Sequence, residues 1–190
     1  MSAARAGGRS RRLGPVAGVL ALALAVTACA RLLGYDAHFT PTPQHVVDAM
    51  LRLGAVGKDD VVYDLGSGDG RVVITAAQKH GARGVGIEID PWLVERSIRA
   101  AEQAGVADRV RFVHQDLLDA DLSPATVVTL YLSQALNARL RPKLLRELRP
   151  GTRIVSHEHD MGDWRADRQI EVEVNGARRP IYLWVAPRSR

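Results

Sequence analysis

Asp64-Leu65-Gly66-Ser67-Gly68-Asp69-Gly70 is the glycine-rich stretch from which the rest of this 190-residue chain can be interpreted. It follows a short apolar run, Val61–Leu65, and precedes an amphipathic segment from about Arg71 to Lys79 that stops at Gly81. Glycines between a strand and a helix let the backbone turn tightly and approach a ligand, and the helix N-terminus offers free N–H donors. The stretch therefore predicts a strand, a ligand-binding turn and a helix.

On both sides of this stretch, apolar runs of strand length alternate with segments of helical pattern. Further strands are predicted at residues 85–89, 110–113, 127–132 and 152–156. Further helices are predicted at 42–53, with Thr42-Pro43 as N-cap and first helical residue, at 91–103, and at 133–148 with an interruption at Pro142. The chain ends in a predicted hairpin of residues 170–174 and 181–185, with Asn175-Gly176 at the turn.

Continuous apolar strands separated by helices indicate a mostly parallel sheet that is covered on both faces. The predicted fold class is therefore α/β, a Rossmann-like, doubly wound, mostly parallel sheet with a C-terminal antiparallel hairpin. At 190 residues, the chain is long enough for one such domain and too short for two.

The spacing of the glycines and the acid before them narrow the choice of ligand. The pattern is G-x-G-x-G, whereas dinucleotide-binding folds carry G-x-G-x-x-G. Asp64 stands at the end of the first strand, where it would repel a pyrophosphate but tolerate an ammonium or sulfonium group. The loop therefore favours a cationic ligand over a dinucleotide.

Two more acidic residues follow the next two strands. Glu88 lies 22 residues after Gly66, where a carboxylate can accept hydrogen bonds from both hydroxyls of a ribose. Asp116, followed by Leu117, comes just after the third strand and can meet the amino group of an adenine. Because the carboxyl ends of parallel strands meet at one edge of a sheet, the three acids predict an adenosine pocket there.

Asp64–Gly70, Glu88 and Asp116 resemble the motifs of the class I, seven-β-strand S-adenosylmethionine-dependent methyltransferases. Three segments resemble, more narrowly, a subgroup of small protein-lysine methyltransferases and their bacterial relatives. These segments are Phe39-Thr40-Pro41-Thr42-Pro43, Val61–Arg71 (VVYDLGSGDGR) and Gly84–Pro91 (GVGIEIDP). The resemblance covers about residues 39–185.

The resemblance implies that the cofactor is S-adenosylmethionine. Asp64 would face its methionine part, Glu88 its ribose and Asp116 its adenine. The full set of cofactor-binding residues that it implies is Asp64, Gly66, Ser67, Gly68, Asp69, Gly70, Glu88, Asp116 and Leu117. It also implies methyl transfer, with a protein lysine as the acceptor that the subgroup favours. A cofactor-binding module that is tethered to a membrane and transfers no methyl group is the alternative.

The catalytic residues are left unassigned, because an in-line methyl displacement needs little acid–base machinery. Tyr131, at the end of the fourth predicted strand, fits either a substrate-facing or a packing role. His157-Glu158-His159-Asp160 offers metal-ligand chemistry, but on a strand the two histidines would share one face while Glu158 points away. No metal is therefore expected, and a place beside the substrate cleft stays open for this segment.

The N-terminus has the pattern of an export signal. Four arginines, and no acidic residue, occur in residues 1–28, where an apolar stretch covers residues 13–28. Its 16 residues suit a signal peptide better than a membrane span of about 20 residues. Val26-Thr27-Ala28-Cys29 resembles a bacterial lipobox, and an uncleaved N-terminus with an idle thiol is the alternative. The predicted organisation is a signal peptide at 1–28, Cys29 as the first mature residue, and a methyltransferase domain at 35–190.

The charge balance limits the choice of partners. The net charge of +5 comes largely from the four N-terminal arginines, and the rest of the chain has 22 basic against 21 acidic side chains. A nearly neutral domain gives no reason to expect a nucleic-acid partner. The expected location is the membrane of a bacterial cell envelope, reached through the N-terminal segment, with the side that the domain faces left open.

Overall fold

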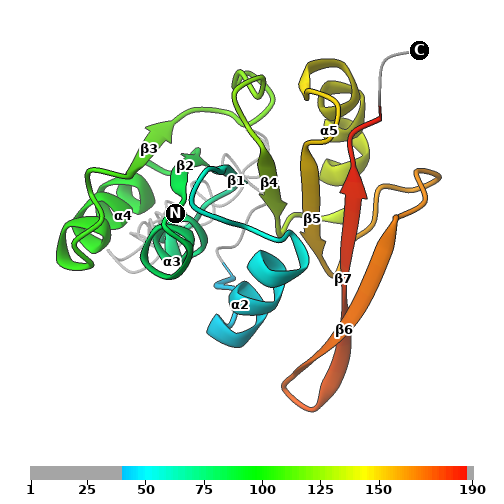
Figure 1. The fold of residues 1–190 in the computed structure, drawn as a ribbon, viewed down its shortest axis with the longest axis horizontal. Helices are drawn as coiled ribbons and strands as arrows, with labels where there is room; N and C mark the ends of the chain where they lie inside the picture. Colours follow the sequence, from blue (N-terminus) through cyan, green and yellow to red (C-terminus); the bar gives the residue numbers. More distant parts are fainter. Residues whose placement is uncertain (1–39, 188–190) are drawn as a thin grey trace, which may run out of the picture. The chain divides into compact units, whose positions relative to one another are not determined.

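A seven-stranded sheet forms the centre of the computed structural model, which describes residues 40–187. The strands are β1 (Val61–Leu65), β2 (Arg83–Glu88), β3 (Val110–His114), β4 (Val127–Leu130), β5 (Arg153–His157), β6 (Arg168–Val174) and β7 (Ala177–Val185). The helices of this part of the chain are α2 (Gln44–Leu53), α3 (Arg71–His80), α4 (Pro91–Gln103) and α5 (Gln134–Glu147) (Figure 1).

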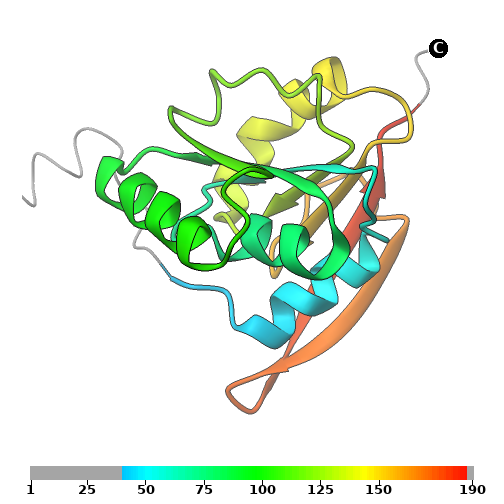
Figure 2. The ribbon, with the colours of Figure 1, turned by 60° about the vertical axis from the view of Figure 1, so that its left-hand side comes forward.

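The strand order is β3-β2-β1-β4-β5-β7-β6. Strands β1 to β5 are parallel, and β7 runs antiparallel to both β5 and β6. Helices α2, α3 and α4 cover one face of the sheet and α5 covers the other (Figure 2). The predicted doubly wound sheet and its C-terminal antiparallel hairpin are confirmed.

The two faces of the sheet divide the side chains of β1 between two cores. Val62 packs in the core under α2 and α3, whereas Tyr63 and Leu65 pack in the core under α5. Since side chains alternate along a strand, Asp64 lies on the same face as Val62. The alternation thus carries a carboxyl group into the protein on the α3 side, next to the glycine-rich loop.

The start of α2 differs from the prediction. The helix begins at Gln44, and its N-cap is Pro43, which has no side chain that could bond the first N–H groups. The assignment of Thr42 as N-cap was wrong by one residue. Instead, the Thr42 carbonyl oxygen accepts a hydrogen bond of 2.7 Å from Arg71 Nη1, which joins the residues before α2 to the start of α3.

The predicted interruption of α5 at Pro142 was also wrong. The helix continues through this proline from Gln134 to Glu147. A proline inside a helix removes one backbone hydrogen bond and normally kinks or breaks it. Here Leu140 and Leu144, on either side of Pro142, are fully buried against the sheet. The packing of these leucines outweighs the local preference of the proline.

The C-terminal hairpin has the predicted turn and longer strands than predicted. Asn175 and Gly176 connect Val174 to its partner Ala177, with φ values of 51° and 77°. Two successive residues with positive φ are characteristic of the type I′ turn, whose twist matches that of the flanking strands. The pairing of β6 with β7 extends down to Arg168, opposite Leu183.

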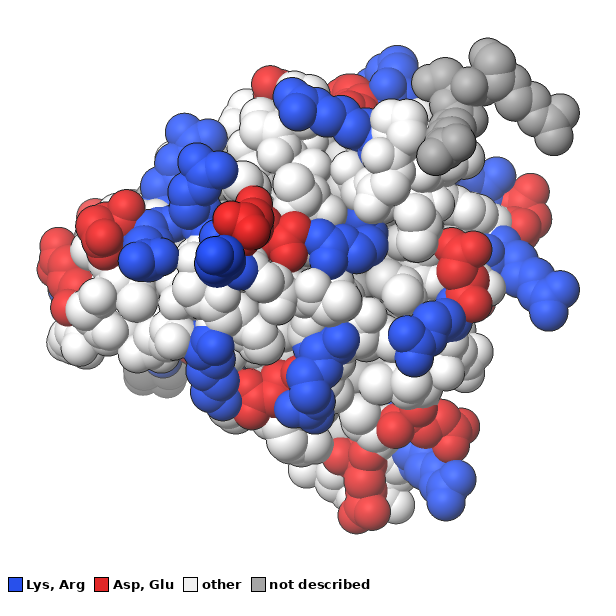
Figure 3. Space-filling model, in the orientation of Figure 1, with Lys and Arg blue, Asp and Glu red and all other residues white. Residues whose placement is uncertain are grey.

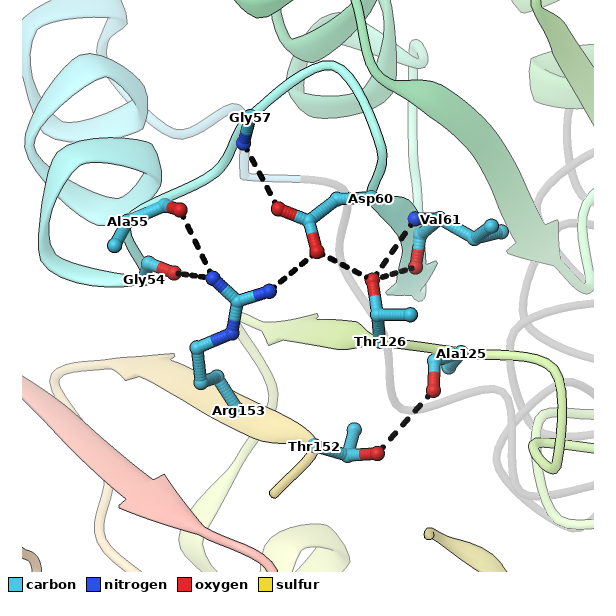
Figure 4. Close-up of polar contacts among 9 residues, drawn as sticks. All are labelled: Gly54, Ala55, Gly57, Asp60, Val61, Ala125, Thr126, Thr152 and Arg153. Carbon is cyan, nitrogen blue, oxygen red and sulfur yellow. Dashed lines mark hydrogen bonds and ion pairs between the residues drawn. The ribbon is translucent and has the colours of Figure 1, made fainter. Parts of the chain in front are cut away.

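A polar network fixes the edge of the sheet where β1, β4 and β5 begin (Figure 4). Arg153 Nη1 donates to the carbonyl oxygens of Gly54 and Ala55 at 2.7 and 2.9 Å, and Arg153 Nη2 pairs with Asp60. Thr126 Oγ1 donates to Asp60 Oδ1 at 2.7 Å. The network joins the loop after α2 to two strands, at the opposite edge from the glycine-rich loop.

The predicted signal peptide, residues 1–28, and Cys29 lie outside the described residues. Within residues 40–187, no helix is both long enough and apolar enough to cross a bilayer.

Gly86, in the middle of β2, allows a close approach that a larger residue would prevent. A β-carbon there would lie 2.6 Å from both Phe112 Cδ1 and Ser67 Oγ. We therefore expect Gly86→Ala to lower the free energy of unfolding by about 1–3 kcal/mol, as overpacking does. The matched control is Gly57→Ala, where a β-carbon meets nothing within 4 Å. Urea denaturation should separate the two, and equal stabilities would contradict the packing argument.

Candidate functional site

The glycine-rich loop lies at the carboxyl end of β1 and opens into α3. Gly66, Gly68 and Gly70 have φ values of 77°, 56° and 78°, a region that side-chain-bearing residues rarely adopt. Gly70 is also the residue from which α3 begins. The loop can therefore turn sharply and bring its backbone close to a ligand, as the sequence predicted.

Glu88 holds this loop in place. Its Oε2 accepts a hydrogen bond of 2.8 Å from Gly68 N, and its Oε1 accepts from Ile89 N and Asp90 N at 2.8 and 3.0 Å. The residue is only 8% exposed. A carboxylate has about four acceptor directions, so three bonds leave it room for one more. Glu88 therefore serves as a structural clamp, a role that the sequence did not reveal, and retains limited capacity for a ligand hydroxyl.

Asp64 is a buried carboxyl group with a raised pKa. Thr129 Oγ1 donates to Asp64 Oδ1 at 2.7 Å, in agreement with the pairing of these residues across β1 and β4. Burial raises the pKa of Asp64 to about 7, and the charges of Glu88 and Asp69 act in the same direction. The group therefore changes charge near neutral pH, and a cation placed beside it would favour the carboxylate.

Asp69 is held by arginine. Arg71 Nε and Nη2 donate to the two carboxylate oxygens of Asp69 at 2.8 and 2.6 Å. Burial opposes ionisation of Asp69, but these bonds outweigh it and lower the pKa of the carboxyl group. The Asp69 side chain thus stabilises the loop through Arg71, which itself reaches Thr42.

Asp116, which follows β3, lies nearer the protein surface than Asp64 and Glu88. Asp116 is exposed, and its Oδ1 accepts a hydrogen bond of 2.9 Å from Leu118 N, while Leu117 packs partly against the core under α5. A bond of 3.0 Å from Gln115 N to the Glu88 carbonyl oxygen joins this turn to the end of β2. The structure thus brings the predicted residues to one edge of the sheet, with Asp116 at its rim.

A second polar cluster follows β4 and β5 on the same edge. The rings of Tyr131 and His157 lie 4.4 Å apart, and Tyr131 Oη donates to Glu158 Oε2 at 3.1 Å. Arg179 Nε pairs with Glu158 Oε1 at 3.0 Å. The sequence did not predict a role for Arg179. This residue lies on β7, 21 residues beyond Glu158, and only the sheet pairing brings the two together.

The expected alternation of residues 157–160 was wrong. The strand ends at His157, and Glu158 has a positive φ of 64°, so its carboxylate turns toward Tyr131 and does not point away. Asp160 lies apart from this cluster and accepts from Gln134 Nε2 at 2.5 Å. Among residues 40–187, no three histidine, cysteine, aspartate or glutamate side chains are placed to hold a metal ion.

The glycine-rich loop and the acidic residues around it fit an adenosyl cation such as S-adenosylmethionine. Asp64 supplies a carboxyl group that a cation would ionise, and Glu88 retains acceptor capacity. Ser67 Oγ is buried and has no hydrogen-bond partner in the structure, so it is available as a donor or acceptor.

Comparisons with known proteins agree with this geometry. The family model of the ANTKMT methyltransferase domain matches residues 64–168. A protein-lysine N-methyltransferase of Saccharolobus islandicus is 42% identical over 148 residues, which are 77% of this chain and 92% of that protein. The adenine nucleotide translocase lysine N-methyltransferase of Mus musculus is 34% identical over 109 residues. Those residues are 57% of this chain and 48% of the mouse protein, so the chain matches about half of that relative.

A solved structure of another methyltransferase is also similar over most of this chain. It is a Salinibacter ruber protein described as an RNA methyltransferase in complex with S-adenosyl-L-homocysteine. It is 55% identical to this chain with a TM-score of 0.75, and the match covers 80% of this chain and 96% of the other.

These findings agree on cofactor and chemistry. The matched family and the named relatives are methyltransferases, and several similar structures contain S-adenosyl-L-homocysteine, the product that S-adenosylmethionine leaves behind. They give no support to the alternative of a binding module without transfer. The protein uses S-adenosylmethionine as a methyl donor, and it belongs to the ANTKMT family of class I methyltransferases.

Proposed function

We propose that this enzyme methylates the ε-amino group of lysine residues in a protein. The observation that carries the proposal is the 42% identity to a protein-lysine N-methyltransferase across 92% of that relative's length. Animal lysine N-methyltransferases named for ATP synthase and for adenine nucleotide translocase also match, at lower identity.

We also propose how the loop residues bind the donor. Asp64 faces the methionine ammonium group, Glu88 accepts a ribose hydroxyl and Asp116 contacts the adenine amino group, while Gly66, Ser67, Gly68 and Gly70 approach the ligand with their backbone. Asp69 acts through Arg71, which keeps the loop in shape. The closeness of Gly68 to Glu88 supports this arrangement, because it places the loop beside the carboxylate.

The donor supplies an electrophilic methyl group: the amine lone pair forms the new N–C bond, the electrons of the C–S bond go to sulfur, and the product ammonium gives a proton to water. The enzyme's own residues hold donor and acceptor in line, and such positioning can contribute up to about 7–11 kcal/mol. A lysine must be neutral to attack, which costs about 4–5 kcal/mol at pH 7 in water. The acceptor site therefore has to favour an uncharged amine.

RNA is the second candidate acceptor, because the similar Salinibacter ruber structure is described as an RNA methyltransferase. RNA binding depends largely on an excess of positive charge. Residues 29–190 carry 22 basic and 21 acidic side chains, and Figure 3 shows blue and red residues interspersed over the visible face. This balance favours a protein acceptor.

The deciding experiment labels denatured extract of the expression host with tritiated S-adenosylmethionine and the full-length enzyme. We expect the label to be lost from the macromolecular fraction after protease treatment but not after ribonuclease treatment. Acid hydrolysis should then yield labelled methyllysine, and mass spectrometry should locate the modified lysine. Label that disappears only with ribonuclease would replace this proposal with RNA methylation.

We further propose that residues 1–28 are a signal peptide, that Cys29 is lipidated after cleavage, and that the domain at 35–190 is thereby held at a bacterial membrane. The arginine-rich start, the apolar stretch of 16 residues and the cysteine at its end support this proposal.

A further inference from the structure

His157, at the carboxyl end of β5, is a buried polar side chain without a hydrogen-bond partner. It is 1% exposed, and neither of its ring nitrogens has a hydrogen-bond partner in the structure. Buried polar groups in native proteins are nearly always hydrogen-bonded, so an exception calls for a specific explanation. Neither the fold nor the proposed cofactor site uses these nitrogens, and a ligand that supplies the missing bond would explain them.

The imidazole is uncharged at neutral pH. Burial lowers the pKa of His157 to about 4 and outweighs the opposing effect of Glu158. A neutral imidazole has one ring nitrogen that accepts a hydrogen bond. The Glu158 charge beside it is matched by Arg179. The surroundings of His157 therefore suit an uncharged amine better than an ammonium ion.

Tyr131 provides a second acceptor beside the first. Its hydroxyl donates its only proton to Glu158, so its oxygen lone pairs are left to accept hydrogen bonds. Arg179 fixes Glu158 at 3.0 Å, and the Glu158 backbone N donates to the Pro180 carbonyl oxygen at 2.8 Å. The direction of the Tyr131 hydroxyl is thus set by groups that are themselves held in place.

The cluster lies next to the glycine-rich loop. Tyr131 directly follows Leu130, which pairs with Leu65, the last residue before Gly66. A β-carbon on Gly66 would lie 2.8 Å from Leu132 Cδ2, so the residues after β4 pack against the loop. An acceptor bound at Tyr131 would therefore be close to the donor's reactive end.

We propose that Tyr131 Oη and one ring nitrogen of His157 bind the acceptor amine, each accepting one of the two N–H bonds of a neutral lysine. With both N–H bonds engaged, the nitrogen lone pair is left to face the methyl group. Tyr131 is the more exposed of the two, so the amine meets its hydroxyl before it reaches the imidazole. This inference rests on the proposed lysine methylation.

The number of N–H bonds on the acceptor provides the test. Lysine has two, monomethyllysine one and dimethyllysine none. The probes are synthetic peptides that span the lysine located in the labelling experiment, with that lysine unmodified, monomethylated or dimethylated. We expect Tyr131→Phe to lower kcat/KM for the unmodified peptide about tenfold or more, with a smaller loss at each added methyl group. A merely structural role would lower all three equally.

Binding measurements separate the acceptor site from the cofactor site. In calorimetry, Tyr131→Phe and His157→Leu should weaken binding of the unmodified peptide to the enzyme saturated with S-adenosylhomocysteine at least about fivefold. Both variants should bind S-adenosylmethionine with a dissociation constant within about twofold of the wild-type value. The matched control is Tyr182→Phe, because Tyr182 is a half-buried tyrosine on β7 outside this cluster.

The outcomes are distinguishable. Wild-type enzyme that forms no methyllysine would overturn both the proposed function and this inference. Wild-type activity together with Tyr131→Phe kinetics and peptide binding like those of Tyr182→Phe would overturn this inference alone. If wild type methylates only the unmodified peptide, the peptide-binding comparison decides. If His157→Leu fails to fold, Tyr131→Phe, which removes one hydroxyl group, still decides.

Discussion

Replacing Glu88 with alanine should weaken S-adenosylmethionine binding by more than tenfold. The substitution removes the proposed ribose contact and also three backbone bonds to the carboxylate, of which the one from Gly68 N holds the glycine-rich loop. Each charge-assisted hydrogen bond contributes about 1.5–3 kcal/mol, and the loss of 1.4 kcal/mol of binding energy is a factor of about ten. Equilibrium dialysis with labelled cofactor measures the change directly.

Two variants make this result specific. Glu102→Ala removes an exposed glutamate from α4 and should leave the affinity within about twofold of wild type. Glu88→Gln keeps one side-chain oxygen as an acceptor and should fall between wild type and Glu88→Ala. Unchanged affinity in a folded Glu88→Ala protein would contradict both the ribose contact and the clamp.

Cofactor affinity should fall steeply as the pH drops below 7, because of Asp64. Burial raises the pKa of this carboxyl group to about 7 in the free protein. A bound ammonium group would favour the carboxylate and lower that pKa, so binding below pH 7 must release a proton. The dissociation constant should then increase by up to about tenfold for each pH unit below 7. Calorimetry in two buffers of different ionisation enthalpy measures the released proton.

Asp64→Asn is the control for this pH dependence. It keeps the size of the side chain but cannot ionise, so its affinity should be weaker at pH 7.5 and nearly independent of pH between 5.5 and 7.5. Proton release of the same size in wild type and Asp64→Asn would show that another group carries the effect.

The same group links stability to pH in the free protein. The folded-state pKa of about 7 lies above the ordinary value of 3.8, so between these values the native state binds more protons than the unfolded state. The contribution of Asp64 to stability is therefore present below pH 3.8 and is lost as the pH rises through 7. Denaturant unfolding should show this loss in wild type relative to Asp64→Asn.

Most of the fold could be predicted from the sequence, because local signals and packing agree. The run before Gly66 is short and apolar except for Asp64, as a strand buried on both faces requires, and Asn175-Gly176 favours one turn type. The prediction failed where tertiary contacts override local preference. At Pro142, the burial of Leu140 and Leu144 keeps α5 continuous, and no local pattern around the proline shows this.

The proposed cofactor site was more predictable than the proposed acceptor site. Asp64, Glu88 and Asp116 each follow a strand, so the parallel sheet alone brings them together. The cluster at Tyr131 depends on a positive φ at Glu158 and on Arg179 from an antiparallel strand. A sequence does not display either feature, because both arise from pairing between distant segments. The clamp between Glu88 and Gly68 was missed because the sequence shows the acid but not its partners.

The most direct test of the account is a calorimetric titration of the full-length protein with S-adenosylmethionine and, separately, with S-adenosylhomocysteine. We expect both to bind one site per chain with micromolar dissociation constants. If folded protein binds neither ligand, the proposed cofactor site is wrong. The roles of Asp64, Glu88 and the proposed acceptor residues Tyr131 and His157 all depend on a donor bound at the glycine-rich loop.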